Sequence, residues 1–279
     1  MSQYWIVRGG SQVTGAATIT SDHDFFIVHK AESFDPEIKI YLNRKYGKID
    51  IEAMSEKIFC AALDKILNEE LSLLQGLPSI DYWTIRFVAR ILMGTTISSW
   101  NDLRDATLAA KEKLRRIALA FHATQYLNVY EDIYGLLKGG RTQEAGLLLG
   151  EVVSRCIAVA NLHYDLCDPA VKWAVFQARR LHTSRSMQAV DALLNYVGCH
   201  PHNDRAVIEH SLRLCNALMA CTLTREESPD VSAVQVAVSD ELLDLSFCIH
   251  GFPSFCGAMN VVERSIRYLT RQVLLDIAR

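Results

Sequence analysis

The feature of this sequence that most constrains its fold is the stretch GGSQVTGAATITSDHDFFIV, residues 9–28. It follows a short β-like run, YWIV (4–7), and ends in a second one, DFFIV (24–28). Asp22 and Asp24 are two residues apart, and in an extended strand side chains at that spacing point to the same face. Two neighbouring carboxylates repel each other and are costly beside an apolar run unless a cation lies between them. Their hard oxygen ligands favour Mg²⁺ or Mn²⁺ over zinc.

The glycines of this stretch and a later aspartate extend the pattern. Gly10 and Ser11 can turn sharply and present backbone N–H groups beside a hydroxyl, which suits the oxygens of a phosphate. Gly15 allows a positive φ or a close approach of chain or ligand. A third β-like run, KIDIEA (48–53), places Asp50 between two isoleucines that we expect to face the core. A third carboxylate from a neighbouring strand is what a two-metal phosphoryl-transfer site needs.

The chain changes character near residue 75. Between the second and third β-like runs, PEIKIYLNRKYG (36–47) is helix-like, with Gly47 as its C-cap. After the third run, 3–4 spacing of apolar residues predicts helices almost throughout. The expected helices after residue 75 are 79–94, 99–122, 124–138, 142–165, 168–182, 186–197, 203–223 and 258–278; the segment 225–240 is a strand or a short helix. We therefore predict an α+β chain, with a small sheet domain over residues 1–76 and a large α-helical domain over 77–279.

Composition limits the partners of such a chain. Its 279 residues are 50% apolar and 22% charged, with a formal net charge of −3. Without a basic footprint we expect no nucleic-acid partner. No uninterrupted apolar run approaches 18 residues and the start lacks the pattern of a signal peptide, so we expect a cytoplasmic protein without a membrane partner. Eight cysteines without a CxxC pair are expected to be reduced and structural.

The order and spacing of these motifs resemble those of the DNA polymerase β-like nucleotidyltransferase superfamily. The family pattern is a strand, GSxxxG, a short spacer, SDxD and a later strand with an aspartate between apolar residues. Here it reads GSQVTG (10–15), AATIT, SDHD (21–24) and IDI (49–51). The match covers about the first 55 residues and is similar to the small-molecule branch, which includes the aminoglycoside nucleotidyltransferases. It implies a polymerase β-like sheet domain, with the helical remainder similar in architecture only.

The resemblance also implies roles for individual residues. Asp22 and Asp24 would hold the Mg²⁺ or Mn²⁺ ions that bind a nucleoside triphosphate, and Asp50 would hold the second ion or help to deprotonate the acceptor. Gly10 and Ser11 would contact the β- and γ-phosphates, and Ser21 would also bind the nucleotide. The implied reaction transfers an NMP, which we expect to be AMP from ATP, to a small molecule such as an antibiotic or a biosynthetic intermediate, with release of pyrophosphate.

One departure from the family concerns the phosphate loop, where Thr14 stands in place of the basic residue often found before the last glycine. We expect a cation from the helical region to compensate. The first candidate is Lys172, beside Trp173 at a predicted helix start, with Arg179 and Arg180 following. The alternative is a half-buried helix with a solvated basic face.

Other signals leave alternatives open. Cys199, His200 and His202 form a CHPH cluster, either a metal site with further ligands elsewhere or a polar loop. Arg116, followed after five residues by His122, loosely resembles a motif of HEPN ribonucleases. Two alternative functions are a toxin-like transferase that modifies tRNA or a protein, and an inactive nucleotide-binding protein. Formation of a homodimer is also left open.

Overall fold

The computed structural model describes residues 4–30, 39–43, 47–69, 80–182 and 184–223. The chain divides into two compact units. The sheet unit comprises Met1–Glu70, Ser79–Ile117 and Leu166–Pro169, and the helical unit comprises Leu71–Pro78, Ala118–Asp165 and Ala170–Arg279. A sheet followed in the chain by helices is the α+β class that the sequence predicted.

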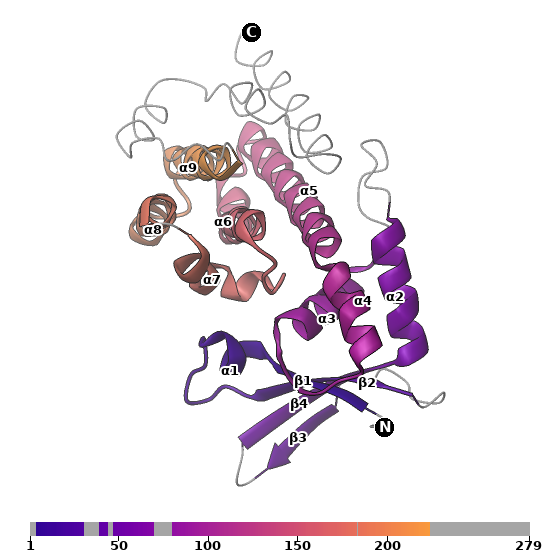
Figure 1. Ribbon diagram of the computed structural model, residues 1–279. Helices are drawn as coiled ribbons and strands as arrows, with labels where there is room; N and C mark the ends of the chain where they lie inside the picture. Colours follow the sequence, from indigo (N-terminus) through magenta and orange to yellow (C-terminus); the bar gives the residue numbers. More distant parts are fainter. Residues whose placement is uncertain (1–3, 31–38, 44–46, 70–79, 183, 224–279) are drawn as a thin grey trace. The chain divides into compact units, whose positions relative to one another are not determined.

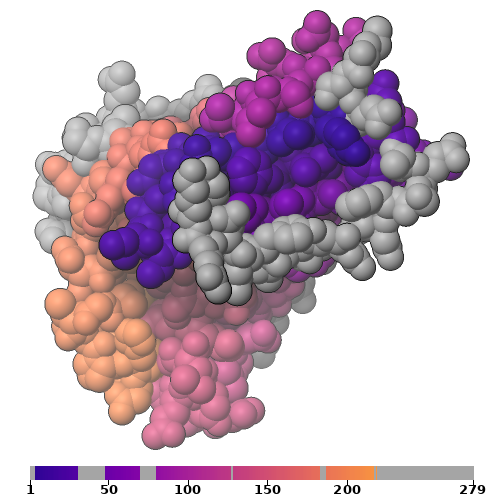
Figure 2. All heavy atoms as spheres, turned by 90° about the horizontal axis from the view of Figure 1, so that it is seen from below, coloured from indigo at the N-terminus to yellow at the C-terminus, as the bar shows by residue number. Residues whose placement is uncertain are grey.

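The sheet unit is built on a mixed five-stranded sheet with the strand order β3-β4-β2-β1-β5. Strands β1 to β4 are labelled in Figure 1. β2 and β4 are parallel, and the other neighbouring pairs are antiparallel. Atoms of the N-terminal strands, indigo to purple, lie at the surface in Figure 2. The strands are β1 (Tyr4–Gly9), β2 (His23–His29), β3 (Lys39–Asn43), β4 (Gly47–Ser55) and β5 (Thr95–Ser98).

Helices α2 (Glu56–Asn68) and α3 (Tyr82–Met93) cover one face of this sheet, and α4 (Asn101–Ala109) packs against α3. The covered face takes alternate residues of the central strands, as the period of two requires. Trp5 of β1 contacts Phe59 of α2 edge-on at 5.8 Å between ring centroids, and Phe26 of β2 contacts Phe87 of α3 in the same way at 5.9 Å. Interlocked aromatic rings thus fix β1 and β2 against the helices.

Several local predictions were wrong. Residues 39–43 form strand β3, not a helix, because Ile40 and Leu42 alternate with polar neighbours and the strand pairs with β4. β5 was missed, and the break predicted near residue 123 lies at Ala110. The isoleucines beside Asp50 are only half-buried, since Asp50 pairs in register with Asp24 and therefore shares the face of Phe26.

The helical unit is organised around α6, which has the longest run of buried residues. The Tyr126 hydroxyl of α5 donates a 2.6 Å hydrogen bond to Asn216 of α9, and the Asn161 amide of α6 donates one of 2.7 Å to the carbonyl of Ala174. These polar contacts link helices across a largely apolar core. The remaining elements are α5 (Lys111–Lys138), α6 (Thr142–Tyr164), η1 (Val171–Trp173), α7 (Ala174–Leu181), α8 (Ser184–Cys199) and α9 (Arg205–Leu223).

Helix α6 is long and apolar enough, by length and composition, to cross a membrane. However, 67% of its most apolar window is buried inside the protein, which is also the pattern of a core helix. The predicted helix 258–278 and the ambiguous segment 225–240 lie outside the described residues. Cys60, Cys156, Cys167, Cys199 and Cys215 form no disulfide bond.

The compact units do not follow the predicted boundary at residue 76. Residues 79–117 and 166–169 belong with the sheet, although they lie in the predicted helical domain. The physical reasons are that β5 pairs with β1 and that Phe87 packs on the sheet. Closure of the site by the helical domain stays a prediction.

Candidate active site

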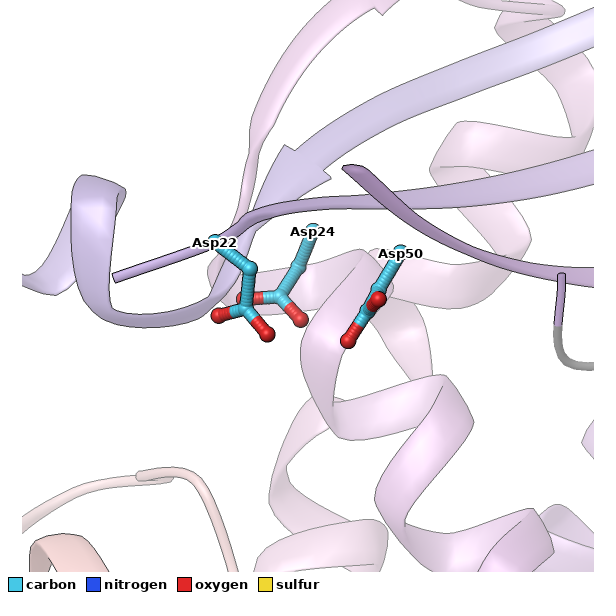
Figure 3. Close-up of side chains that lie close together, drawn as sticks. All are labelled: Asp22, Asp24 and Asp50. Atoms are coloured by element: carbon cyan, nitrogen blue, oxygen red, sulfur yellow. The ribbon is translucent and has the colours of Figure 1, made fainter. Parts of the chain in front are cut away.

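Three carboxylates meet at one end of the parallel strand pair (Figure 3). Asp22 immediately precedes β2, Asp24 is the second residue of β2, and Asp50 lies beside Asp24 in register on β4. Each offers an oxygen atom, and these atoms all lie within 4.8 Å of one another. The structure therefore brings together the three aspartates singled out in the sequence, hereafter the carboxylate cluster, and such a cluster could hold a divalent cation.

The electrostatics of the cluster are uneven. Partial burial, together with the neighbouring charge of Asp22, raises the pKa of Asp24 above its ordinary value, although the Arg90 guanidinium opposes this. Burial also acts to raise the pKa of Asp22, but the hydrogen bond from Lys48 and other contacts outweigh it and lower that pKa. Asp24 is thus the carboxylate that most lacks a compensating positive charge.

Lys48 is a member of the site that the sequence analysis missed. Its Nζ atom donates hydrogen bonds to Asp22 Oδ2 at 3.0 Å and to Asp50 Oδ2 at 3.1 Å. Lys48 precedes Asp50 by two residues on β4, so both side chains point to the same face. The period-two argument that joined Asp22 to Asp24 would have found it.

The glycine-rich loop is built against Asp24. Gly10 begins the short helix α1 (Gly10–Thr14) with a positive φ of 68°, and Gly15 ends it with a φ of 79°. A Cβ atom at Gly10 would collide with the Asp24 carboxylate. Gly10 is therefore required both for its backbone conformation and for the close approach of the loop to Asp24.

The serines of the motif are held within the loop. Ser11 is buried, and its carbonyl accepts a hydrogen bond from the Thr14 hydroxyl. The Ser21 hydroxyl accepts a 2.7 Å hydrogen bond from the Thr18 N–H, which closes the turn before Asp22. Gln12 of α1 donates to the Ser21 carbonyl at 3.4 Å and ties the helix to that turn. Contacts of these residues with phosphate stay predictions.

A second group of charges, hereafter the buried ion-pair cluster, lies further along the same face and comprises Glu52, Arg86, Arg90 and Asp168. Arg90 donates from Nη1 to Glu52 and from Nε to Asp168, both at 3.2 Å, and Arg86 lies 3.2 Å from the same Glu52 oxygen. The side chains of Arg90 and Asp168 are only 6% and 5% exposed. The sequence analysis missed this cluster, because its members come from three separate parts of the chain.

Arg90 also reaches the loop that lacks a basic residue at Thr14. It lines a small pocket next to α1 that is partly open to solvent. The two arginines and two carboxylates of the buried ion-pair cluster balance in charge, so this cluster as a whole adds no net positive charge beside the loop. The pocket is lined by Gly9, Gly10, Val13, Thr14, Arg90, Met93, Gly94 and Asp168.

The other candidates lie outside the sheet unit or are engaged elsewhere. Lys172 belongs to the helical unit, where its Nζ lies 5.1 Å from the ring centroid of Trp173, and its predicted contact with a triphosphate stays a prediction. His122 is fully buried and receives a 3.1 Å hydrogen bond from Arg155, whereas Arg116 pairs with Glu112. Residues six apart on a helix do not share a face, so the structure does not bring Arg116 and His122 together.

The CHPH cluster is engaged with the end of α8. His200 Nδ1 lies 2.8 Å from the Tyr196 carbonyl, and His202 Nε2 lies 2.7 Å from the Val197 carbonyl. These bonds leave the other ring nitrogen of each histidine available to a metal. Among the described residues, however, only Asp22, Asp24 and Asp50 bring three ligand atoms together, which favours the polar-loop interpretation.

Comparisons with known proteins add little to this picture. No protein-family model matches the chain, and no curated protein sequence matches it either. Among solved structures, the chain is similar to a nucleotidyltransferase-like protein from Exiguobacterium sibiricum 255-15, with 14% identity and a TM-score of 0.40. The similarity covers 89% of this chain and 83% of that one. A likeness this distant carries no functional inference, so the proposal below rests on the residues of the sheet unit.

Proposed function

We propose that this protein is a divalent-metal-dependent nucleotidyltransferase. It would transfer an NMP, AMP by our expectation, from a nucleoside triphosphate to a hydroxyl or similar nucleophile of a small molecule. The observation that carries the proposal is the carboxylate cluster: Asp22, Asp24 and Asp50 converge from neighbouring strands beside a loop whose Gly10 abuts Asp24.

The donor set fits a hard divalent cation. All three ligands are carboxylates, which suit Mg²⁺ or Mn²⁺. The Oδ1 atom of Asp50 is buried and has no hydrogen-bond partner among the described residues. A buried carboxylate oxygen without a partner is costly, and a cation or an acceptor hydroxyl would satisfy it.

The residues divide the proposed reaction among them. Asp22, Asp24 and Asp50 would hold a divalent cation, which would supply positive charge to offset the negative charge that develops during phosphoryl transfer. Gly10, Ser11 and Ser21 would contact the triphosphate from the loop side, next to the metal ligands Asp22 and Asp24. The acceptor oxygen attacks the α-phosphorus in line, its proton passes to Asp50, and the bond to the pyrophosphate leaving group breaks.

A small acceptor fits the charge of the chain better than a polynucleotide does. The net charge of −3 and pI near 6.3 give no sequence-wide attraction to a phosphate backbone. An antibiotic and a biosynthetic intermediate are equally compatible with the site.

The test is to incubate the protein with Mg²⁺, each labelled NTP and a panel of small acceptors, and to measure pyrophosphate release. We expect Asp22→Asn, Asp24→Asn and Asp50→Asn each to lower turnover by at least about a hundredfold, because each removes a ligand or the proton acceptor. Asp105→Asn, which changes an exposed carboxylate of α4, is the matched control and should keep full turnover.

Three outcomes would redirect the proposal. Full turnover of an Asp22→Asn/Asp24→Asn double variant would overturn the site. Transfer to tRNA or to a protein, with none to small molecules, would indicate a toxin-like transferase. Saturable NTP binding without any turnover would indicate an inactive nucleotide-binding protein.

A further inference from the structure

We propose that Lys48 is a resident counter-ion of the carboxylate cluster, which a divalent cation must displace in order to bind. The inference rests on the metal site of the proposed function and goes beyond it, because it assigns a role to a residue outside the family motif. The observation behind it is the bridging position of the Lys48 ammonium between Asp22 and Asp50.

The geometry places the two cations in competition for the same carboxylates. The Lys48 ammonium lies 3.0 Å from Asp22 Oδ2 and 3.1 Å from Asp50 Oδ2, and these carboxylates also belong to the group able to hold a metal. A divalent ion such as Mg²⁺ binds carboxylate oxygens at about 2.0–2.1 Å and tolerates little distortion. An ammonium and such an ion bound to the same two carboxylates repel each other, so binding of the ion weakens the hold of these carboxylates on Lys48.

Lys48 is also placed so that it can leave. Its side chain is 41% exposed, against 29% for Asp22 and 19% for Asp50. A lysine side chain is a flexible four-carbon stem, and exposed ion pairs are weak, so release requires no change in the fold. The backbone of Lys48 is held in β4 by pairing with β3, so only the side chain has to move.

The released ammonium stays on the face of β4 that carries Asp50. A polyphosphate oxygen there can replace the carboxylates as its partner. Lys48 therefore favours a cation that arrives together with polyphosphate over the cation alone, since only the former offers the displaced ammonium a new partner.

The first experiment measures Mn²⁺ binding without nucleotide, by the loss of the free-ion signal in electron paramagnetic resonance. We expect Lys48→Met to bind Mn²⁺ up to about fivefold more tightly than the wild type, since the competing ammonium is gone. Lys48→Arg keeps a cation at the site and should not bind more tightly. Lys57→Met, on the exposed face of α2, is the matched control for loss of a distant charge and should match the wild type.

The second experiment follows displacement in the wild-type protein directly. Reductive methylation, quantified for each lysine by mass spectrometry, should modify Lys48 several-fold faster in saturating Mg²⁺ than with chelator, while Lys57 is unchanged. In Asp24→Asn, with metal affinity reduced but the Lys48 contacts retained, the same Mg²⁺ concentration should have little effect. This readout does not depend on activity or on folding of the Lys48 variants.

The outcomes separate this inference from the proposed function. The displacement proposal is wrong, and the metal site stands, if the wild type binds Mn²⁺ but Lys48→Met binds it no more tightly. The same conclusion follows if the methylation rate of Lys48 does not change when Mg²⁺ is added. If neither the wild type nor Lys48→Met binds Mn²⁺, with or without ATP, both proposals fail.

Discussion

The carboxylate cluster and the buried ion-pair cluster share one face of the sheet unit but differ in exposure and in charge balance. In the first, one lysine that is 41% exposed faces three aspartates. In the second, two arginines balance Glu52 and Asp168, and the Arg90 and Asp168 side chains are almost completely buried. Asp50 and Glu52, two residues apart on β4, thus belong to clusters of different kinds.

This difference in burial and charge balance distinguishes charges that stabilise the fold from charges that are available to bind a ligand. A buried pair with both partners present is close to neutral for stability, but removal of one partner leaves an uncompensated charge in a poor solvent. An exposed pair contributes little and can exchange partners with water or a ligand. We therefore expect substitutions to affect mainly stability in the buried ion-pair cluster and mainly ligand binding in the carboxylate cluster.

The largest expected effect is that of Arg90→Met. It would leave the buried Asp168 carboxylate without the guanidinium 3.2 Å away, at a cost of about 3–5 kcal/mol in the free energy of unfolding. Urea denaturation followed by circular dichroism measures it. Arg86→Met, which removes only one of the two arginines at Glu52, is the matched control with a smaller loss. A loss for Arg90→Met no larger than for Lys48→Met would contradict the contrast between the clusters.

The next effect comes from Gly10, which joins the phosphate loop to the carboxylate cluster. Gly10→Ala imposes a side chain at a φ of 68° and against the Asp24 carboxylate, so we expect a loss of roughly 1–2 kcal/mol together with weakened metal binding. Gly135→Ala is the matched control. Its site in α5 is open, and alanine should stabilise that helix by about 0.5–1 kcal/mol. If Gly10→Ala leaves the Mn²⁺ affinity unchanged, the conformation of the loop does not affect metal binding.

These two clusters also show what the sequence could predict. Asp22, Asp24 and Asp50 follow from local strand parity and a short motif, so the cluster was expected before the structure. Lys48 lies two residues before Asp50 on the same strand and was therefore predictable, but the family motif contains only the carboxylates. The pairing of Arg90 with Asp168 joins residues 78 positions apart, and no local pattern indicates it.

The fold was predicted to a similar extent. The strands at 4–9 and 23–29 carry continuous apolar runs, the strand at 47–55 alternates apolar and polar residues, and the fold class follows from their order along the chain. The strand at 39–43 was missed because a five-residue run fits a helix as well as a strand until its pairing with β4 is known. The boundary of the sheet unit depends on packing of Phe87, which is equally invisible in local sequence.

The smallest and most discriminating effect is a difference in sign within the carboxylate cluster. Burial and the charge of Asp22 raise the pKa of Asp24, so ionised Asp24 opposes folding at neutral pH. Asp24→Asn should therefore raise the free energy of unfolding by about 0.5–1 kcal/mol. The same variant should abolish NMP transfer. The net pKa of Asp22 is lowered with help from Lys48, so Asp22→Asn should lower the melting temperature by roughly 1–2 °C. Thermal melts at pH 7 with chelator measure both.

The pH dependence of unfolding gives the same contrast independently. For Asp24, whose folded pKa is raised, the stability contributed by its proton is present below the ordinary value of 3.8 and is lost as pH rises through the folded pKa. For Asp22, whose folded pKa is lowered, the stability is present above 3.8 and is lost as pH falls through the folded pKa. In the wild type, ionisation of Asp24 lowers the free energy of unfolding as pH rises, and Asp24→Asn should remove this decrease. Ionisation of Asp22 raises the free energy of unfolding as pH rises, and Asp22→Asn should remove this increase. If both variants shift the curve in one direction, the two carboxylates are equivalent, and Lys48 does not distinguish between them in the metal-free protein.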